Sequence, residues 1–463
     1  MNISKIQWAN SLVLGAIIFT CYIISSILLI NLDSLVLFTF FLFIGFLLYN
    51  NPNFIIRYVM IFFMCLGNII GVFICENTSL YLSELDIISF YSGSFPLLAL
   101  GWFVFLFVLY LLDTKYQFNS KTIPIIKVKF KDIRISVKGV IFIAFALFSL
   151  ILIAHVGSHP FFLEGIDRFQ YQQKYLQGYW QQIIGWASLC IPIILLLIIE
   201  NKSKLSATVL GIYLLFLFMT GEKFGGFWNV IVIASIVYSI YGQTLDKNKL
   251  FKVLGRLFFV FICLLIVLFV HRGLNYNSSL ANNTDYFLQR MAQQGQLWWK
   301  TYDSEKGSGF RVNELQDETR TYFEFSDTNV KDYNHAIYKI MRVTTPEDIF
   351  DKKIESGSRY STSTFATMYY YFKEIGVLGY AVIGAVCFWL IMRAFMYSVA
   401  NNYLVELYIS GRLLFDSYAA LTQSEFNLLF SYKSMVYIGI FLFLYLLRQF
   451  LNKKRYISNE LTK

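Results

Sequence analysis

The stretch Ser94-Phe-Pro-Leu-Leu-Ala-Leu-Gly-Trp-Phe-Val-Phe-Leu-Phe-Val-Leu-Tyr-Leu-Leu112 contains no charged residue. A continuous apolar run of this kind matches a hydrocarbon core of about 30 Å, which an α-helix of about 20 residues crosses. The whole chain has the same character, because 57% of its 463 residues are hydrophobic, 19% are aromatic and only 15% are charged. Soluble globular domains are more polar than this. The sequence therefore predicts an all-α polytopic membrane protein.

Similar apolar runs recur along the chain, and together they predict ~12 transmembrane helices. The expected spans cover about 11–30, 34–50, 54–75, 94–112, 139–155, 183–200, 205–219, 227–242, 257–270, 375–396, 401–431 and 434–451. The segment 401–431 is the least clear, because it carries Glu406, Arg412, Asp416 and Glu425. It is either a polar span that faces the bundle or an interfacial helix. A cytoplasmic C-terminus requires it to cross the membrane, so we expect a span here.

Three short basic segments set the expected orientation. The segments 113–138, 201–204 and 247–256 are rich in Lys and Arg, and loops of this kind stay on the cytoplasmic side. Both termini are then cytoplasmic, whereas the loops 156–182 and 272–373 face outward. The same segments account for the formal net charge of +10, so membrane lipid is the expected partner and nucleic acid is not.

The predicted topology divides the chain into three regions. Residues 1–271 contain spans 1 to 9, residues 272–373 form a large outer-face loop between spans 9 and 10, and residues 374–463 contain spans 10 to 12 and a cytoplasmic tail.

The cysteines and histidines give no sign of a metal centre. The six cysteines lie in or at the ends of apolar runs without a Cys-X-X-Cys pair, and the four histidines show no His-Glu-X-X-His motif. Zinc sites and catalytic metal sites normally show such spacings. We therefore expect no metal and no cofactor.

Two polar motifs stand in the shorter loops that are expected on the outer face. The segment 159–174 contains Arg168 and Tyr171, and Gly221-Glu-Lys-Phe-Gly-Gly226 places the charge pair Glu222–Lys223 between two spans. Charges near membrane depth are costly and are usually functional. The flanking glycines permit turns and a close backbone approach.

Two further motifs mark the ends of the large loop. Near its start, Arg272 is followed by Arg290-Met-Ala-Gln-Gln-Gly-Gln-Leu-Trp-Trp299. Near its end, Ser356-Gly-Ser-Arg-Tyr-Ser-Thr-Ser-Thr-Phe365 leads to Glu374 at the start of span 10.

The shared outer-face position of these motifs predicts a site for a phosphorylated glycan carried on lipid. The candidate cations are Arg168, Lys223, Arg272, Arg290 and Arg359. The guanidinium fork suits bidentate contact with phosphate oxygens. The candidate sugar-binding residues are Tyr171, Gln294, Gln296, Trp298, Trp299 and Tyr360. Their rings would stack on sugar rings, and their amides and hydroxyls would bond the sugar hydroxyls.

Each residue also has a plainer interpretation. The pair Trp298–Trp299 could anchor the chain at a membrane interface, and an Arg at a span end could reach toward lipid headgroups. The 272–372 stretch has about as many acidic as basic residues, so its charges could pair with one another. The joint restriction of these residues to one face favours a functional site.

The three motifs at Gly221–Gly226, Arg290–Trp299 and Gly357–Gly376 resemble those of the O-antigen polysaccharide polymerases (Wzy type). The resemblance extends over most of the chain in hydropathy, loop placement and motif order. It implies a bacterial inner-membrane glycosyltransferase with a GT-C-like fold and a periplasmic active site. The substrate would be an undecaprenyl-pyrophosphate-linked oligosaccharide. The growing glycan would move from its lipid pyrophosphate to the terminal sugar of a new repeat, and a chain-length regulator would be a possible partner.

The resemblance also assigns roles to residues in a metal-independent mechanism. The five cations would neutralise the pyrophosphates, which is electrostatic stabilisation of a leaving group. Glu222 is the first candidate for the base that accepts the acceptor hydroxyl proton, and Glu374, Asp167 and His335 follow. Glu222 could instead only pair with Lys223.

Three rivals remain open. One of them, a scaffold or lipid-binding membrane protein, would tolerate the loss of all the outer-face arginines. An O-antigen ligase would use the same donor but a lipid-A sugar as acceptor. A repeat-unit flippase would be a transporter with charged groups in its spans and two related halves. Spans 1 to 10 are nearly free of charge and no halves are evident, so polymerase is the favoured prediction, followed by ligase and then flippase.

Overall fold

The structure is a computed structural model. It describes residues 5–28, 30–116, 190–201, 204–219, 225–241, 255, 280–322, 335–355, 360, 364–401 and 403–461. The expected spans 139–155 and 257–270 lie outside these residues.

Within the described residues, six helical segments are long and apolar enough to cross a membrane. They are Asn10–Leu28, Asp33–Asn50, Val59–Asn77, Phe95–Lys115, Thr364–Asn401 and Tyr432–Phe450. They belong to α1 (Lys5–Leu28), α2 (Asp33–Asn50), α4 (Val59–Asn77), α5 (Phe95–Lys115), α18 (Thr364–Asn401) and α21 (Tyr432–Leu461). The helical class is confirmed, and several helices can span a membrane. The total of ~12 spans stays a prediction from the apolar runs.

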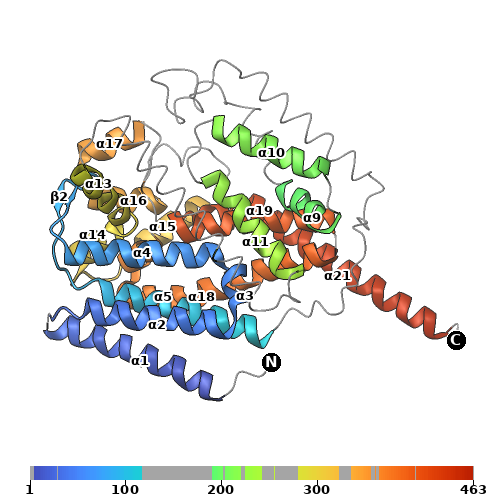
Figure 1. The fold of residues 1–463 in the computed structure, drawn as a ribbon, viewed down its shortest axis with the longest axis horizontal. Helices are drawn as coiled ribbons and strands as arrows, with labels where there is room; N and C mark the ends of the chain where they lie inside the picture. Colours follow the sequence, from blue (N-terminus) through green and yellow to red (C-terminus); the bar gives the residue numbers. More distant parts are fainter. Residues whose placement is uncertain are drawn as a thin grey trace.

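Three shorter apolar helices coincide with expected spans 6 to 8. They are α9 (Ile191–Asn201), α10 (Lys204–Met219) and α11 (Gly225–Tyr241). Helix α9 packs against α19 (Leu404–Gln423), and α10 and α11 pack against α9; in Figure 1 this group lies on the side of the molecule away from α1.

The expected span 54–75 is not one continuous helix. It divides into α3 (Pro52–Arg57) and α4, with Tyr58 between them in a non-helical conformation. Asn51 begins α3 by accepting a hydrogen bond from the Phe54 N–H, and Pro52 takes the first helical position, where its missing N–H costs nothing.

A buried carboxylate joins the end of α4 to the start of α5. Glu76 is 4% exposed and accepts hydrogen bonds from the backbone N–H groups of Ser92, Gly93 and Ser94 at 2.6, 3.1 and 2.8 Å. The hydroxyls of Ser92 and Ser94 also donate to it. An anion at a helix N-terminus is favourable because the backbone donors there lack helical partners.

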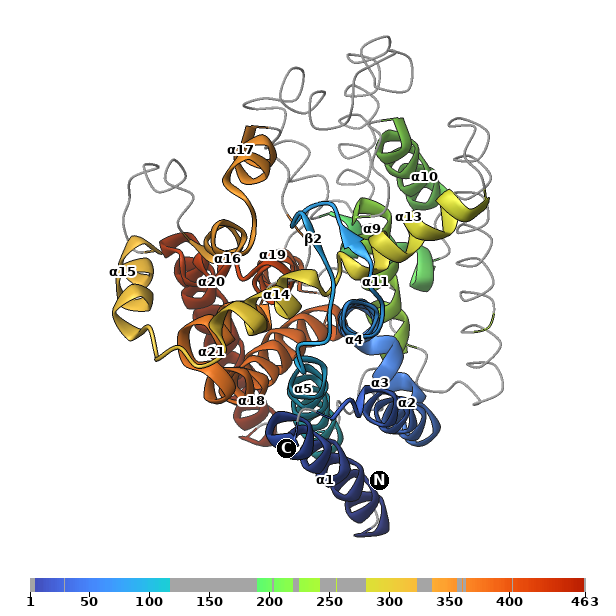
Figure 2. The ribbon, with the colours of Figure 1, turned by 90° about the vertical axis from the view of Figure 1, so that its left-hand side faces the viewer.

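The described part of the expected outer loop is largely helical. It contains α13 (Leu280–Ala292), α14 (Gln296–Glu305), α15 (Val312–Tyr322), α16 (Ala336–Thr344) and α17 (Glu347–Glu355). These helices gather at the end of the bundle that carries the hairpin of β1 (Tyr81–Leu82) and β2 (Ile87–Ile88) (Figure 1). Seen from that end, α13 and α14 cross in front of the long helices (Figure 2).

This segment shares one hydrophobic core with the long helices. Trp298, Trp299 and Ile337 belong to the same cluster of buried side chains as Phe95 of α5 and Val377 of α18. Because their burial removes apolar surface from water on both sides of the contact, the segment is fixed to the bundle end.

Helix α18 bends where the expected span 375–396 begins. Lys373 has φ 53° and ψ −141°, a conformation that interrupts the helix. A Cβ added to Gly376 would lie 2.2 Å from the Met368 carbonyl oxygen. The bend therefore requires glycine at this position, and it separates the polar start of α18 from its apolar remainder.

The ambiguous segment 401–431 forms α19 and the short α20 (Phe426–Phe430). Both acidic side chains of α19 are turned inward, since Glu406 is fully buried and Asp416 is 4% exposed, and Ser410 is fully buried as well. Glu406 pairs with Arg448 of α21, and Asp416 pairs with Arg412. This burial favours the polar helix facing the bundle over an interfacial helix, while its crossing of the membrane stays a prediction.

Candidate functional site

The Gln-Gly-Gln motif of the sequence packs directly on α4. A Cβ added to Gly295 would lie 2.3 Å from the Val72 backbone nitrogen, and one added to Gly71 would lie 2.7 Å from the Gly295 nitrogen. Real Cβ atoms do not approach backbone this closely. The two glycines therefore allow a backbone-to-backbone contact between α4 and the turn that joins α13 to α14.

The two tryptophans that follow are buried against the start of α5. Trp298 is 3% exposed and its Nε1 donates to the Ser94 carbonyl at 3.1 Å. Trp299 is fully buried and its Nε1 donates to the Phe90 carbonyl at 2.9 Å. Both indoles thus satisfy their single polar atom inside the protein.

Glu84, in the turn between β1 and β2, connects α14, α17 and Tyr360. Its carboxylate accepts hydrogen bonds from the Gln296 amide and from Lys353 Nζ, the latter at 2.6 Å. Its backbone carbonyl accepts a hydrogen bond from the Tyr360 hydroxyl. Sequence reasoning did not single out Glu84, because only the fold shows that its turn meets residues more than 200 positions away.

Four of the expected sugar-binding residues are therefore turned into the protein. Gln296, Trp298, Trp299 and Tyr360 are at most 3% exposed, and their contacts hold α14 and Tyr360 on the bundle end. Their contact with a sugar stays a prediction.

The other described candidates at the start of the segment are more accessible. Arg290 is exposed and donates to the Tyr286 hydroxyl at 2.8 Å and to Gln293 Oε1 at 3.0 Å. The Gln294 backbone carbonyl accepts a hydrogen bond from Asn68 at 2.6 Å. The candidates Arg168, Tyr171, Glu222, Lys223, Arg272 and Arg359 lie outside the described residues.

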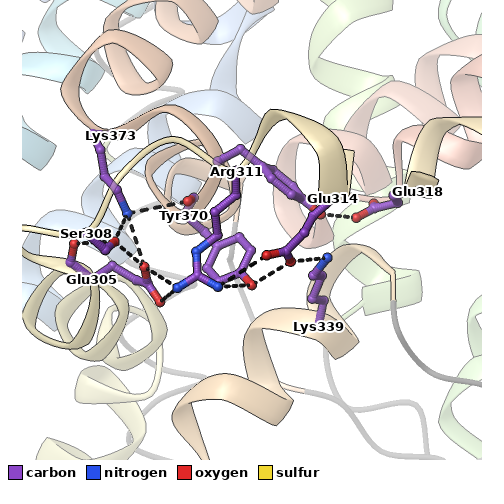
Figure 3. A network of polar contacts seen from close by, with 9 residues as sticks. Glu305, Ser308, Arg311, Glu314, Glu318, Lys339, Tyr370 and Lys373 are labelled. Carbon is purple, nitrogen blue, oxygen red and sulfur yellow. Dashed lines mark hydrogen bonds and ion pairs between the residues drawn. The ribbon is translucent and has the colours of Figure 1, made fainter. Parts of the chain in front are cut away.

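A network of charges surrounds the bend of α18 (Figure 3). Glu305 is the centre of one half, where Arg311 Nη2 lies 2.9 Å and Lys373 Nζ 3.1 Å from its carboxylate. Glu314 is the centre of the other half, with Lys339 Nζ at 2.8 Å and the Tyr370 hydroxyl at 2.9 Å.

This network ties α14, α15 and α16 to the start of α18. Arg311 bridges the two halves, since it bonds Glu305 and also donates to the Tyr370 hydroxyl at 2.8 Å. The Tyr371 hydroxyl donates to Glu318 of α15. The three acidic and three basic members drawn in Figure 3 balance one another, so the network acts as a structural clamp on the bend.

We expect Glu305→Gln to destabilise the bundle end strongly. The change leaves the positive charge of buried Lys373 without its carboxylate, and breaking a buried pair in this way costs about 3–5 kcal/mol. Thermal unfolding of the purified protein in detergent measures the loss. Asp317→Asn is the matched control, because the side chains of its pair with Arg320 are 77% and 69% exposed and such pairs contribute about 0–1 kcal/mol. Equal shifts for the two variants would contradict the clamp.

Glu314 makes the clamp sensitive to acid. Burial alone would raise the pKa of its carboxyl, but hydrogen bonds from Lys339 and Tyr370 and the charge of Arg311 lower it below the ordinary 4.5. A folded-state pKa below the unfolded one stabilises the fold above about pH 4.5, and this contribution is lost as pH falls through the folded pKa.

We therefore expect proteolysis of the 300–322 segment to accelerate as pH falls from 4.5 toward 3, measured with an acid-active protease. Glu314→Gln should already be cleaved faster at pH 6 and should respond less to acid. A variant with the same pH profile as the natural protein would exclude Glu314 as the cause.

Glu374 differs from these clamped carboxylates. It follows the bend of α18, is half-buried and shares a hydrogen bond with Tyr22 of α1. Among the described residues it has no ion-pair partner, whereas Glu305, Glu314, Glu84 and Glu406 each pair with a cation.

Tyr302 and Tyr369 interact electrostatically with this carboxylate. The rings of Tyr302 and Tyr369 stack with centroids 5.0 Å apart, and the Trp298 ring lies 5.6 Å from that of Tyr369. Burial and the nearby Tyr22 and Glu374 raise the pKa of the Tyr302 hydroxyl, which therefore stays protonated as a hydrogen-bond donor. The exposed Lys306 places its Nζ 5.7 Å from the centroid of the Tyr302 ring.

The structure thus brings together one candidate from the sequence and several residues that the sequence did not indicate. Glu374 is the candidate, and it meets a tyrosine group formed by Tyr22, Tyr302 and Tyr369. These tyrosines come from α1, α14 and α18, so no local motif joins them. A carboxylate that has no ion-pair partner in the described part of the chain, and that lies next to phenol donors, can accept a proton from a sugar hydroxyl.

Comparison with known proteins gives a match to the part of the chain that contains Glu374. A family model described as "Family of unknown function (DUF6418)" matches residues 330–438. The matched range includes α16, α17, the bend of α18 with Glu374, and α19. No curated protein and no solved structure matches the chain.

Proposed function

We propose that this protein is a membrane glycosyltransferase that polymerises lipid-linked oligosaccharide repeats, in the manner of the O-antigen polymerases that its motifs resemble. Its site would face the periplasm of a bacterial inner membrane. The growing glycan would be transferred from undecaprenyl pyrophosphate to the terminal sugar of a new lipid-linked repeat.

The observation that carries the proposal is the position of Glu374. It is half-buried, it follows the bend of a long apolar helix, and the tyrosine group lies beside it. A lipid-linked sugar would have its polyprenyl chain beside the apolar helices and its glycan at their polar end. Tyrosine rings and hydroxyls can both stack on and hydrogen bond to sugars at that boundary.

The proposed reaction is a single displacement at the anomeric carbon of the donor. The acceptor hydroxyl oxygen forms the new bond to this carbon, and the bond from the carbon to the pyrophosphate oxygen breaks. The leaving pyrophosphate keeps the electron pair, and the Glu374 carboxylate takes the hydroxyl proton. Among the described residues, Arg290 and Lys306 are exposed cations that can stabilise the pyrophosphate as charge develops.

The proposal also includes the candidate cations that lie outside the described residues. Arg168, Lys223, Arg272 and Arg359 would bind the pyrophosphates of the donor and acceptor. Glu222 stays the alternative base.

Deletion of the gene distinguishes the three activities. Loss of a polymerase leaves lipid A-core capped with one repeat, loss of a ligase removes all capping, and loss of a flippase leaves lipid-linked repeats on the cytoplasmic face. We expect one-repeat capping, read from lipopolysaccharide on a gel, with the full ladder restored by the natural gene. Complete loss of capping would contradict a polymerase; lipid-linked repeats on the periplasmic face would then indicate a ligase, and repeats confined to the cytoplasmic face a flippase.

A further inference from the structure

A second group of polar residues lies at the other end of the bundle from Glu374. Helix α3 is at the end opposite β2 (Figure 1), and its last residue, Arg57, is 6% exposed. Arg57 Nη1 lies 2.7 Å from both oxygens of Asp113 on α5. The Tyr58 hydroxyl also donates to Asp113, at 3.2 Å.

Helix α18 adds a second guanidinium to this group. Arg393 interacts electrostatically with Asp113, Tyr58 and Arg57. Its guanidinium carbon lies 5.5 Å from the centroid of the Trp389 ring. Two arginines and a tryptophan therefore meet between α3, α5 and α18.

Two buried donors in this group have no acceptor among the described residues. They are Arg57 Nε and Trp389 Nε1. Buried N–H groups are paired in more than about 90% of cases, by protein, water or ligand. Since Asp113 already accepts from Arg57 Nη1, the two orphan donors and the guanidinium of Arg393 leave this group with donors that an additional anion would satisfy.

The surroundings indicate the type of anion. Helix α5 ends at Lys115, the Tyr116 side chain that follows is 47% exposed, and its ring lies 5.5 Å from that of Trp389. Aromatic and basic side chains at the end of a span are typical of the lipid headgroup level. Arginine forks and indole N–H groups suit phosphate oxygens, and basic pockets between spans bind lipid headgroups.

We propose that Arg57, Trp389 and Arg393 form a phosphate-binding site at the end of the bundle remote from Glu374. The ligand is a phosphate group, either the headgroup of an anionic lipid or free phosphate. This site is separate from the proposed glycosyl-transfer site, so it stands whether or not the polymerase proposal holds.

The test uses the full-length protein in nanodiscs. Its unfolding temperature is measured in phosphatidylcholine alone, with increasing phosphatidylglycerol, and with inorganic phosphate in phosphatidylcholine. Trp389→Phe keeps an aromatic ring and removes one orphan donor. Trp102→Phe is the matched control, because Trp102 Nε1 is also buried without a partner in the described residues but packs against Phe365 near the other end of α18.

We expect phosphatidylglycerol to raise the unfolding temperature of the natural protein and of Trp102→Phe. Trp389→Phe should need about tenfold more of the lipid for the same rise, since it loses one hydrogen bond to a charged group. The same pattern with inorganic phosphate would support the site with free phosphate as ligand. No rise with either ligand, or an equal response of the two variants, would overturn the proposal.

Discussion

Cells that carry Glu374→Gln in place of the natural protein are expected to make lipopolysaccharide capped with one repeat and almost no ladder. Glutamine has the shape of glutamate and retains a partner for Tyr22, but it cannot take a proton from the acceptor hydroxyl. General-base groups contribute about 10²–10⁴-fold to rate. Polymer should therefore fall by about 100-fold or more, measured by gel densitometry at matched protein levels.

Asp351→Asn is the control for this variant, because Asp351 is an exposed carboxylate on α17. It should give the full ladder. A full ladder from Glu374→Gln would remove Glu374 from the mechanism and make Glu222 the leading base.

Gly295→Ala is expected to destabilise the contact of α14 with α4 by about 3 kcal/mol, at the upper end for overpacked cores. The new methyl group would stand 2.3 Å from the Val72 nitrogen and 2.7 Å from the Gly71 carbonyl carbon. Backbone on both sides cannot move without displacing α4 or α14. The expected result is a lower unfolding temperature in detergent and faster proteolysis between 290 and 300.

Gly309→Ala provides the matched substitution, since a Cβ there meets nothing within 4 Å. It should leave the unfolding temperature nearly unchanged. Gly71→Ala approaches the same contact from α4 and should behave like Gly295→Ala. If Gly295→Ala and Gly71→Ala unfold at the same temperature as the natural protein, the glycine contact does not hold α14 against α4.

The apolar helices could be predicted from the sequence because the length of an apolar run is a local property. The predicted starts of α2 and α5 lie within one residue of the observed ones. The break at Tyr58 could not be predicted in the same way. The 54–75 run is apolar apart from Arg57 and Asn68, and the ion pair of Arg57 beside the break joins residues 56 positions apart.

The packing role of the Gln-Gly-Gln-Leu-Trp-Trp motif also could not be predicted, because it arises from tertiary contacts. The sequence showed residues suited to sugar binding, and the same residues suit a buried junction that is rich in hydrogen bonds. The choice depends on whether a partner such as Ser94 or Glu84 lies opposite, which sequence spacing does not reveal. The sequence offered Glu374 only as a candidate base behind Glu222, since charges near membrane depth are usually functional, and its tyrosine neighbours could not be predicted.

The most direct test of the proposed function is polymerisation by the purified protein. The protein in detergent is given a defined undecaprenyl-pyrophosphate-linked repeat and a metal chelator, with no other protein, and the products are measured by mass spectrometry. The proposal predicts glycans of two or more repeats, one released undecaprenyl pyrophosphate per bond formed, and no product from Glu374→Gln. Folded natural protein that leaves the substrate as single repeats would contradict it.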